Sequence, residues 1–271
     1  KSEDDNWLDR LSPYYKEFEI EPPNELSSDA VHSFDEAVCR VLEERPPAIV
    51  SFHFGLPGEA LTHRLKAAGI KIMSSATTVQ EARWLVEHGC DAVIAQGYEA
   101  GGHRGMFLTE DTNTQMGTMS LVPQIVDAVG VPVIAAGGIA DGRGVAAAFA
   151  LGASAAQVGT AYLFTEEATI SDIYRSALQS VKSVPTTFTN IFSGRPARCA
   201  VNRVLQDIGP LTDIVPAFPT GFSAITPLRI AAEQQDSPGF SAHYCGQSAA
   251  LGSSSTARQL TLDLAAAVKD R

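Results

Sequence analysis

Short apolar runs alternate with amphipathic stretches along the middle of the chain. The runs are four to seven residues long and are typical of buried parallel strands; they lie at 48–54, 71–75, 92–95, 131–136 and 155–158. The stretches between them repeat apolar residues at helical spacing and predict helices at 58–68, 79–88, 121–129 and 142–151. This alternation predicts an α/β fold in which helices cover parallel strands.

Helices and irregular segments are expected on both sides of this alternation. Residues 1–47 are polar and interrupted by prolines, with one helix predicted around Trp7, Leu11 and Phe18 and a second at 34–44. Beyond residue 165, the pattern predicts helices at 170–181, 228–233 and 260–268 and an extended segment at 186–192. We therefore expect four segments: a helical segment at 1–47, part of a barrel at 48–165, a mainly helical cap or substrate region at 166–251, and a C-terminal helix at 252–271.

Glycines follow the last two predicted strands of the middle region. Gly137 and Gly138 come directly after 131–136, and Gly159 with Thr160 comes after 155–158. Glycines leave backbone N–H groups uncovered by side chains, and the threonine adds a hydroxyl donor. In (β/α)8 barrels the loops after strands seven and eight commonly bind a phosphate. The two glycine loops therefore predict a phosphate site.

The predicted phosphate site indicates which strands of a barrel these five are. If the two strands before the glycines are the seventh and eighth of a (β/α)8 TIM barrel, then 48–54 is the fourth strand. Five strands alone would leave an open sheet with unpaired edges. We therefore expect this chain to supply strands four to eight, and an N-terminal portion of the same protein, upstream of Lys1, to supply the first three.

A glycine-rich loop at 97–118 carries one histidine among its glycines. His103 follows Gly101 and Gly102, and its imidazole could take or give a proton near neutral pH. A lone histidine in a loop more often only forms hydrogen bonds, so both interpretations stay open. Arg104 is a weaker candidate for contact with an anionic substrate. His53, on the first strand of the middle region, is expected to line a pocket rather than to act as an acid or base.

Charge and composition narrow the classes of partner. Twenty Lys and Arg against 31 Asp and Glu give a net charge of −11, which disfavours nucleic acid and anionic membrane surfaces. No apolar run is long enough to span a bilayer and no signal peptide is apparent, so a cytoplasmic protein is expected. The four cysteines and the other histidines lack the spacing of metal ligands. We expect free thiols and no metal site.

Five stretches, in order along the chain, resemble the nitronate monooxygenase family, formerly called 2-nitropropane dioxygenases. They are the residues 50–57 (VSFHFGLP), 96–105 (QGYEAGGHRG), 135–139 (AAGGI), 157–160 (QVGT) and 189–198 (TNIFSGRPAR). The resemblance extends from about Trp7 to Leu251. The family begins with three further strands upstream, in agreement with the strand count.

The resemblance implies an oxidoreductase, a flavoprotein monooxygenase that uses FMN. It would oxidise alkyl nitronates, such as propionate 3-nitronate, with molecular oxygen to a carbonyl compound and nitrite or nitrate. It implies His103 as the catalytic residue. The flavin contacts of the family correspond to Gln96, Gly101, Gly138, Gln157, Val158, Gly159 and Thr160, and the neighbouring Gly102 and Gly137 complete the expected cofactor site. An asparagine ligand on the third strand of the family has no counterpart in this sequence.

Three other functions stay open at this stage. An FMN-dependent NADH:quinone reductase or enoyl-thioester reductase would share the histidine loop and the phosphate site. A dehydrogenase of the inosine monophosphate type would need a nucleophilic cysteine in a loop, and none of the four cysteines lies in one. A non-catalytic phosphate-ligand binder, or an inactive fragment, would need no catalytic histidine. For the nitronate monooxygenase, the expected partners are a small-molecule nitronate and oxygen, and the expected state is a monomer or homodimer.

Overall fold

The computed structural model describes residues 3–28, 32–180 and 185–269, which group into two compact units. Unit 1 comprises the described residues of Lys1–His32, Gly101–His103 and Glu167–Ala250. Unit 2 comprises those of Ser33–Ala100, Arg104–Glu166 and Leu251–Arg271. The segment expected at 1–47 is thus shared between the two units.

Unit 2 is built on a parallel sheet. Its five strands within the described residues are β1 (Ile49–Phe52), β2 (Lys71–Ala76), β3 (Ala92–Gln96), β5 (Val133–Ala136) and β6 (Ala155–Gln157). They pair in the order β1-β2-β3-β5-β6, with each strand parallel to its neighbour. The five predicted strands are therefore confirmed, and the parallel α/β fold is that expected for strands four to eight of a TIM barrel. Three further strands before Lys1 stay a prediction.

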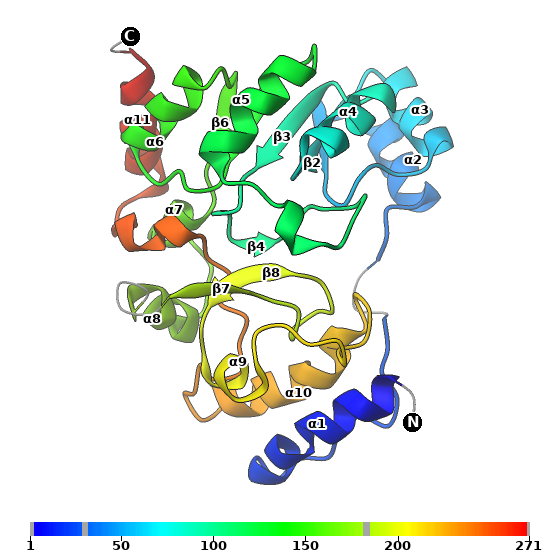
Figure 1. Ribbon diagram of the computed structural model, residues 1–271, viewed down its shortest axis with the longest axis vertical. Helices are drawn as coiled ribbons and strands as arrows, with labels where there is room; N and C mark the ends of the chain where they lie inside the picture. The colour runs from blue at the N-terminus through cyan, green and yellow to red at the C-terminus, as the bar shows by residue number, and fades with distance from the viewer. Residues whose placement is uncertain (1–2, 29–31, 181–184, 270–271) are drawn as a thin grey trace. The chain divides into compact units, whose positions relative to one another are not determined.

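Helices cover this sheet, most of them in the cyan to green part of the chain in Figure 1, with α2 in blue and α11 in red. They are α2 (Glu36–Glu44), α3 (Glu59–Ala67), α4 (Val79–Glu87), α5 (Thr118–Ala128), α6 (Gly142–Ala150), the single turn α7 (Thr160–Leu163) and α11 (Ala257–Lys269). Three of them begin at Asp35, Thr78 and Asp141, whose side chains accept hydrogen bonds from N–H groups of the first turn. Leu65, Leu85, Leu121 and Ile125 are fully buried between helices and sheet. The helices predicted between the strands are therefore confirmed.

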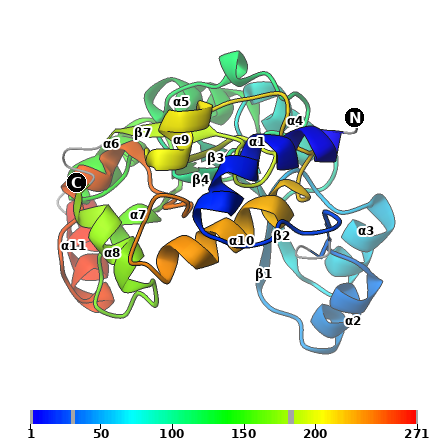
Figure 2. The same cartoon turned by 90° about the horizontal axis from the view of Figure 1, so that it is seen from below.

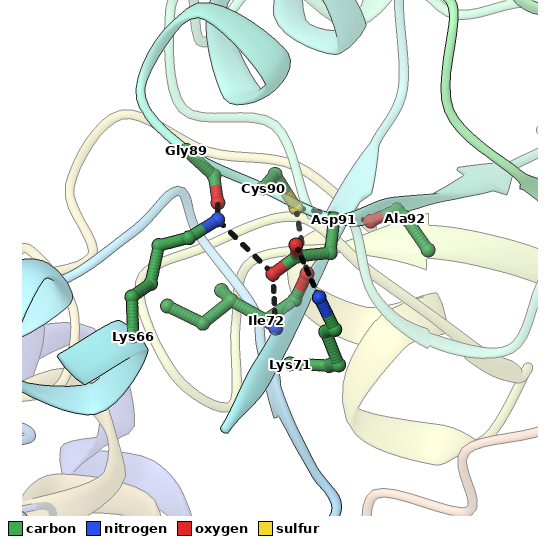
Figure 3. Close-up of polar contacts among 7 residues, drawn as sticks. All are labelled: Lys66, Lys71, Ile72, Gly89, Cys90, Asp91 and Ala92. Atoms are coloured by element: carbon green, nitrogen blue, oxygen red, sulfur yellow. Dashed lines mark hydrogen bonds and ion pairs between the residues drawn. The ribbon is translucent and has the colours of Figure 1, made fainter. Parts of the chain in front are cut away.

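Polar contacts hold the amino ends of β2 and β3 together (Figure 3). One carboxylate oxygen of Asp91 accepts hydrogen bonds from the Ile72 N–H at 3.0 Å and from Lys66 Nζ at 3.2 Å. Burial alone would raise the pKa of Asp91, but these contacts outweigh it and hold that pKa below its usual value. In barrel folds this end of the strands serves stability, whereas the opposite end carries the site.

Unit 1 combines helices with a small antiparallel sheet of order β4-β8-β7 in the described residues. Its elements are α1 (Glu3–Glu17), β4 (Gly102–His103), α8 (Asp172–Ser180), β7 (Thr186–Thr189), β8 (Ala197–Ala200), α9 (Arg203–Ile208) and α10 (Gly221–Glu233), and η2 (Gln247–Leu251) ends at its border. Trp7 and Leu11 of α1 are fully buried in one core with Ile225 and Leu228 of α10. Figures 1 and 2 both show α1 lying along α10.

Some predicted elements of unit 1 were wrong in extent. The extended segment expected at 186–192 ends at Thr189, because the N–H groups of Ser193 and Gly194 both bond to Asn190 O and close a turn. The helix expected at 228–233 begins already at Gly221 and accommodates Pro227. The helix expected at 170–181 begins at Asp172, and Val181 lies outside the described residues. The loop at 97–118 contains β4 and a short 3-10 turn, η1 (Thr112–Thr114).

No helix in the described parts of the chain has both the length and the hydrophobicity that a membrane crossing needs.

Candidate functional site

The strand register brings most of the predicted cofactor residues of unit 2 to one edge of the sheet. Gln96, the last residue of β3, lies opposite Ala136 of β5, and Ala136 lies opposite Gln157 of β6. The residues that follow, among them Gly137 and Val158, therefore leave the sheet at the same edge. Three stretches that are far apart in the sequence thus form one cluster of backbone turns.

Gly137 and Gly138 both adopt backbone conformations that favour glycine, with φ of +106° and +74°. A Cβ atom at Gly137 would lie 3.0 Å from Ala100 N and 3.2 Å from Gly97 O. The loop after β3 therefore packs directly on the loop after β5. Thr118 joins them, because its Oγ1 lies 2.9 Å from Gly137 O and 2.8 Å from a carboxylate oxygen of Glu99.

Gly159 differs from these two glycines because it has open space beside it. A Cβ atom built on Gly159 has no heavy atom within 4 Å, and its φ of −111° suits any residue. The glycine is exposed and directly precedes Thr160, the first residue of α7. A phosphate needs N–H and hydroxyl donors beside unfilled space, so these turns fit a phosphate group. Which residues contact a cofactor stays a prediction.

The side chains of Gln96 and Arg104 form hydrogen bonds that hold this loop in place. The side-chain Oε1 of Gln96 accepts a hydrogen bond from the Gly105 N–H at 2.7 Å. Arg104 is 1 % exposed, and its guanidinium donates to Gln96 O and Gly97 O at 2.8 Å each and to Gln115 Oε1 at 2.9 Å. The sequence suggested that Arg104 contacts substrate, but these bonds occupy the guanidinium within unit 2 and favour a role in holding the loop.

Replacing Arg104 with methionine is expected to lower the free energy of unfolding by about 3 kcal/mol, because two buried carbonyl groups lose charged donors. Urea unfolding followed by circular dichroism measures the change. Arg143→Met is the matched control, since Arg143 is exposed and its ion pair with Asp141 is expected to contribute less than about 1 kcal/mol. Equal effects of the two substitutions would refute the loop-holding role.

His53 lies one residue beyond β1 in unit 2 and is exposed. Its Nδ1 lies 3.0 Å from Ser75 Oγ, and a Cβ atom at Gly105 would come within 2.8 Å of its ring. One side of the imidazole therefore contacts the loop that carries Arg104. This environment is compatible with the expected lining role, which stays a prediction.

His103 belongs to unit 1, where β4 places it opposite Ala197 of β8. Its Nε2 lies 2.8 Å from Ser193 Oγ. The rings of Phe218, Phe222 and Tyr244 surround the imidazole, with centroid distances of 5.6, 6.2 and 5.4 Å. The contact with Ser193 and the packing of three aromatic rings both favour one orientation of the imidazole.

The two glycines before His103 allow the backbone of β4 to adopt its conformation and to pack closely. A Cβ atom at Gly101 would lie 2.5 Å from the Gly246 N atom, so only glycine allows this close backbone approach. Gly102 has a φ of +76° and sits opposite Arg198 in the ladder between β4 and β8. Both glycines thus have a packing or conformational reason within unit 1.

A cavity of about 470 Å³ lies within unit 1 next to these rings. Its lining includes Phe192, Phe222, Ile225, Arg229, His243 and Tyr244. Phe222 and Tyr244 therefore contact both the cavity and the surroundings of His103. The Tyr244 hydroxyl is buried without a hydrogen-bond partner among the described residues, and burial raises the pKa of Tyr244. Sequence reasoning missed Tyr244, because no motif marks a tyrosine that reaches a site from 141 residues further along the chain than His103.

Comparisons with known proteins agree on one family. The family model described as nitronate monooxygenase matches residues 2–267. A nitronate monooxygenase of Paraburkholderia phytofirmans is 43 % identical over 261 residues, which cover 95 % of this chain and 71 % of the relative. One of Pseudomonas aeruginosa is 41 % identical over 257 residues, covering 94 % and 73 %.

Two solved structures superpose on most of this chain and therefore share its fold. The crystal structure of nitroalkane oxidase from Streptomyces ansochromogenes superposes with a TM-score of 0.87 at 38 % identity, covering 97 % of this chain and 76 % of that one. FabK from Thermotoga maritima superposes with a TM-score of 0.68 at 29 % identity, covering 89 % and 74 %.

Proposed function

Because the chain belongs to the nitronate monooxygenase family, we propose that it oxidises alkyl nitronates with molecular oxygen to a carbonyl compound and nitrite or nitrate. The observation that carries this proposal is the family match over residues 2–267. Substrates of the propionate 3-nitronate type and a cytoplasmic location belong to the same proposal.

The family is flavin-dependent, and FMN is the cofactor we propose for this chain. The turns at Gly138, Gly159 and Thr160 would hold its phosphate through backbone N–H groups and the threonine hydroxyl, with the open space at Gly159 to receive it. Gln96 and Gln157 end the two strands on either side of β5 and would border the same group. When bound, FMN supplies electron transfer between the nitronate and oxygen.

His103 is the residue of the chain that we propose for proton transfer. Its imidazole can take the acidic α-proton of a neutral nitroalkane, or donate a hydrogen bond to a nitronate oxygen. The rings of Phe218, Phe222 and Tyr244 keep the imidazole in an apolar surrounding, where a hydrogen bond to an anion is stronger than in water.

Two measurements on the purified chain test the proposal. Reconstitution with FMN should give a flavin absorption spectrum and release FMN on denaturation. Oxygen uptake should follow addition of propionate 3-nitronate, with nitrite or nitrate and an aldehyde as products. Oxidation of NADH with a quinone or an enoyl thioester, in place of oxygen uptake with the nitronate, would identify the alternative reductase; a colourless chain inactive in both assays would favour a non-catalytic binder.

A further inference from the structure

One face of α10 forms a wall of the cavity in unit 1. The lining residues on this helix recur every three or four positions and so share one side of it: Phe222, Ile225, Thr226, Arg229 and Glu233. The Phe222 ring also faces the His103 ring, with a centroid distance of 6.2 Å, whereas Arg229 is exposed and lies where the cavity opens to solvent. These two lining residues are seven positions apart, a rise of about 10 Å along the helix. The cavity therefore extends from the surroundings of His103 toward solvent.

Hydrogen bonds to regular structure hold the opposite wall in place. Much of this wall is the segment 240–244. The Ala200 N–H of β8 donates to His243 O at 3.0 Å, and Nδ2 of Asn202, the N-cap of α9, donates to Ser241 O at 2.9 Å. The wall is thus fixed to a strand and to a helix, so the cavity is already formed before a ligand enters.

Aromatic side chains give the cavity a mainly apolar surface. Five rings line it, those of Tyr174, Phe192, Phe222, Phe240 and Tyr244. Such rings bind the apolar part of a ligand, and each methylene group that they bury strengthens binding roughly fourfold. At about 470 Å³, the cavity has the size of sites that bind whole organic molecules, and it is larger than a three-carbon acid needs.

The polar groups of the lining leave one cation available to a ligand. Within the described residues, the Arg229 guanidinium has neither a hydrogen bond nor an ion pair. Glu233, one turn further along α10, instead accepts a hydrogen bond from Ser241 Oγ at 2.7 Å. Burial lowers the pKa of His243 to about 4, although the Glu233 carboxylate acts in the opposite direction, so this imidazole is neutral near pH 7. An anionic group at the opening of the cavity would therefore meet Arg229 as an unpaired positive charge.

We propose that this cavity binds the organic part of the substrate, and that the chain prefers nitronates with an apolar chain of about eight carbons ending in a carboxylate. The nitronate group would lie at His103, the methylene groups between the aromatic rings, and the carboxylate at Arg229. This inference rests on the proposed oxidation of nitronates and names the class of nitronate. It makes Arg229 and Thr226, a half-buried residue of the lining, determinants of substrate preference.

Steady-state oxygen uptake by the FMN-reconstituted chain, with three nitronates, tests the preference. Octanoate 8-nitronate should have a kcat/KM on the order of 100-fold above that of propionate 3-nitronate, because its five further methylene groups enter the cavity. Octane 1-nitronate has the same length without the carboxylate. Its kcat/KM should lie between the two, about fivefold below that of octanoate 8-nitronate, since an exposed ion pair contributes little.

Two substitutions separate the contributions of charge and of space. Arg229→Met should lower kcat/KM for octanoate 8-nitronate about fivefold relative to octane 1-nitronate, because only the first substrate loses an ion pair. Thr226→Phe narrows the cavity and should lower kcat/KM for both eight-carbon nitronates roughly tenfold relative to propionate 3-nitronate. These ratios compare substrates on one protein sample, so a reduced folded fraction does not change them.

Matched controls come from exposed positions outside the lining. Arg258→Met removes an exposed arginine from α11 in unit 2, and Ile230→Phe enlarges a residue that is 47 % exposed on α10 and outside the cavity lining. Both variants should keep the wild-type ratios. Isothermal titration calorimetry with octanoate, which carries no nitro group, measures occupation of the cavity without the reaction. Octanoate should bind the wild-type chain and bind Thr226→Phe roughly tenfold more weakly.

Equal kcat/KM values for propionate 3-nitronate and octanoate 8-nitronate in the wild-type chain would overturn the inference, and this comparison needs no variant to fold. Ratios left unchanged by Arg229→Met and Thr226→Phe, or no binding of octanoate, would overturn it as well. Failure of the proposed function is a different result. A chain that oxidises none of the three nitronates refutes the reaction, and the substrate assignment with it, even where octanoate binds.

Discussion

Replacing His103 with asparagine is expected to lower kcat/KM for a neutral nitroalkane by roughly 10²–10⁴-fold, the range that a general base contributes. Asparagine keeps a polar side chain of similar width within the shell of Phe218, Phe222 and Tyr244, so the loss reports proton transfer rather than packing. Steady-state oxygen uptake at several pH values, with enzyme concentration set by bound flavin, measures the effect.

The same variant should oxidise a preformed nitronate with a much smaller loss, because the α-proton has already left. His88→Asn is the matched control: His88 is exposed and stacks on Trp84 in unit 2, and its replacement should leave both substrates unaffected. Equal losses on nitroalkane and nitronate would exclude proton abstraction and assign His103 to binding of the anion.

Replacing Gly159 with valine is expected to weaken FMN binding on the order of 100-fold, with little change in stability. A Cβ atom at this position meets no heavy atom within 4 Å in the protein, so the fold should tolerate the larger side chain. It would instead fill the space in which we place the phosphate and separate it from the backbone N–H groups, each of which contributes a charge-assisted hydrogen bond. Fluorescence titration of the unliganded chain with FMN measures the dissociation constant.

Gly130→Val is the control for this substitution, since Gly130 also has no heavy atom within 4 Å of a built Cβ and lies before β5, at the other end of that strand. It should retain wild-type affinity. Riboflavin, which lacks the phosphate, should bind both variants and the wild-type protein equally. Unchanged FMN affinity in Gly159→Val would show that the phosphate lies elsewhere.

The parallel strands of unit 2 could be predicted closely because their signal is local. Each strand is a short apolar run, and each following helix repeats apolar residues with its own period. The differences are a residue or two at the ends; β5, for example, begins at Val133 rather than at residue 131. The glycines after β5 and β6 could also be found from sequence, because a turn that needs positive φ or an uncovered amide selects glycine at a definite position.

Contacts in unit 1 could not be predicted in this way, because they join segments far apart in the chain. Trp7 of α1 packs in the same core as Leu228 of α10, and nothing in the polar N-terminal sequence indicates that partner. Likewise, Ser193 stood out in the sequence only as part of the stretch 189–198 that resembles the family, since its partner His103 lies 90 residues earlier. The bonds of Arg104 to Gln96 O and Gly97 O are a further tertiary feature that its sequence position did not indicate, and its contact with substrate stays a prediction.

By itself, then, the amino-acid sequence determined the alternation of strands and helices, the glycine turns at the strand ends and the family to which the chain belongs. These depend on residue periodicity and on short motifs, which are properties of neighbouring residues. Only the tertiary structure decided that Ser193 contacts Nε2 of His103, that Arg104 is buried and that open space lies beside Gly159. Those features depend on which distant segments pack together, and packing is set by the summed burial and hydrogen bonding of the whole chain rather than by any local pattern.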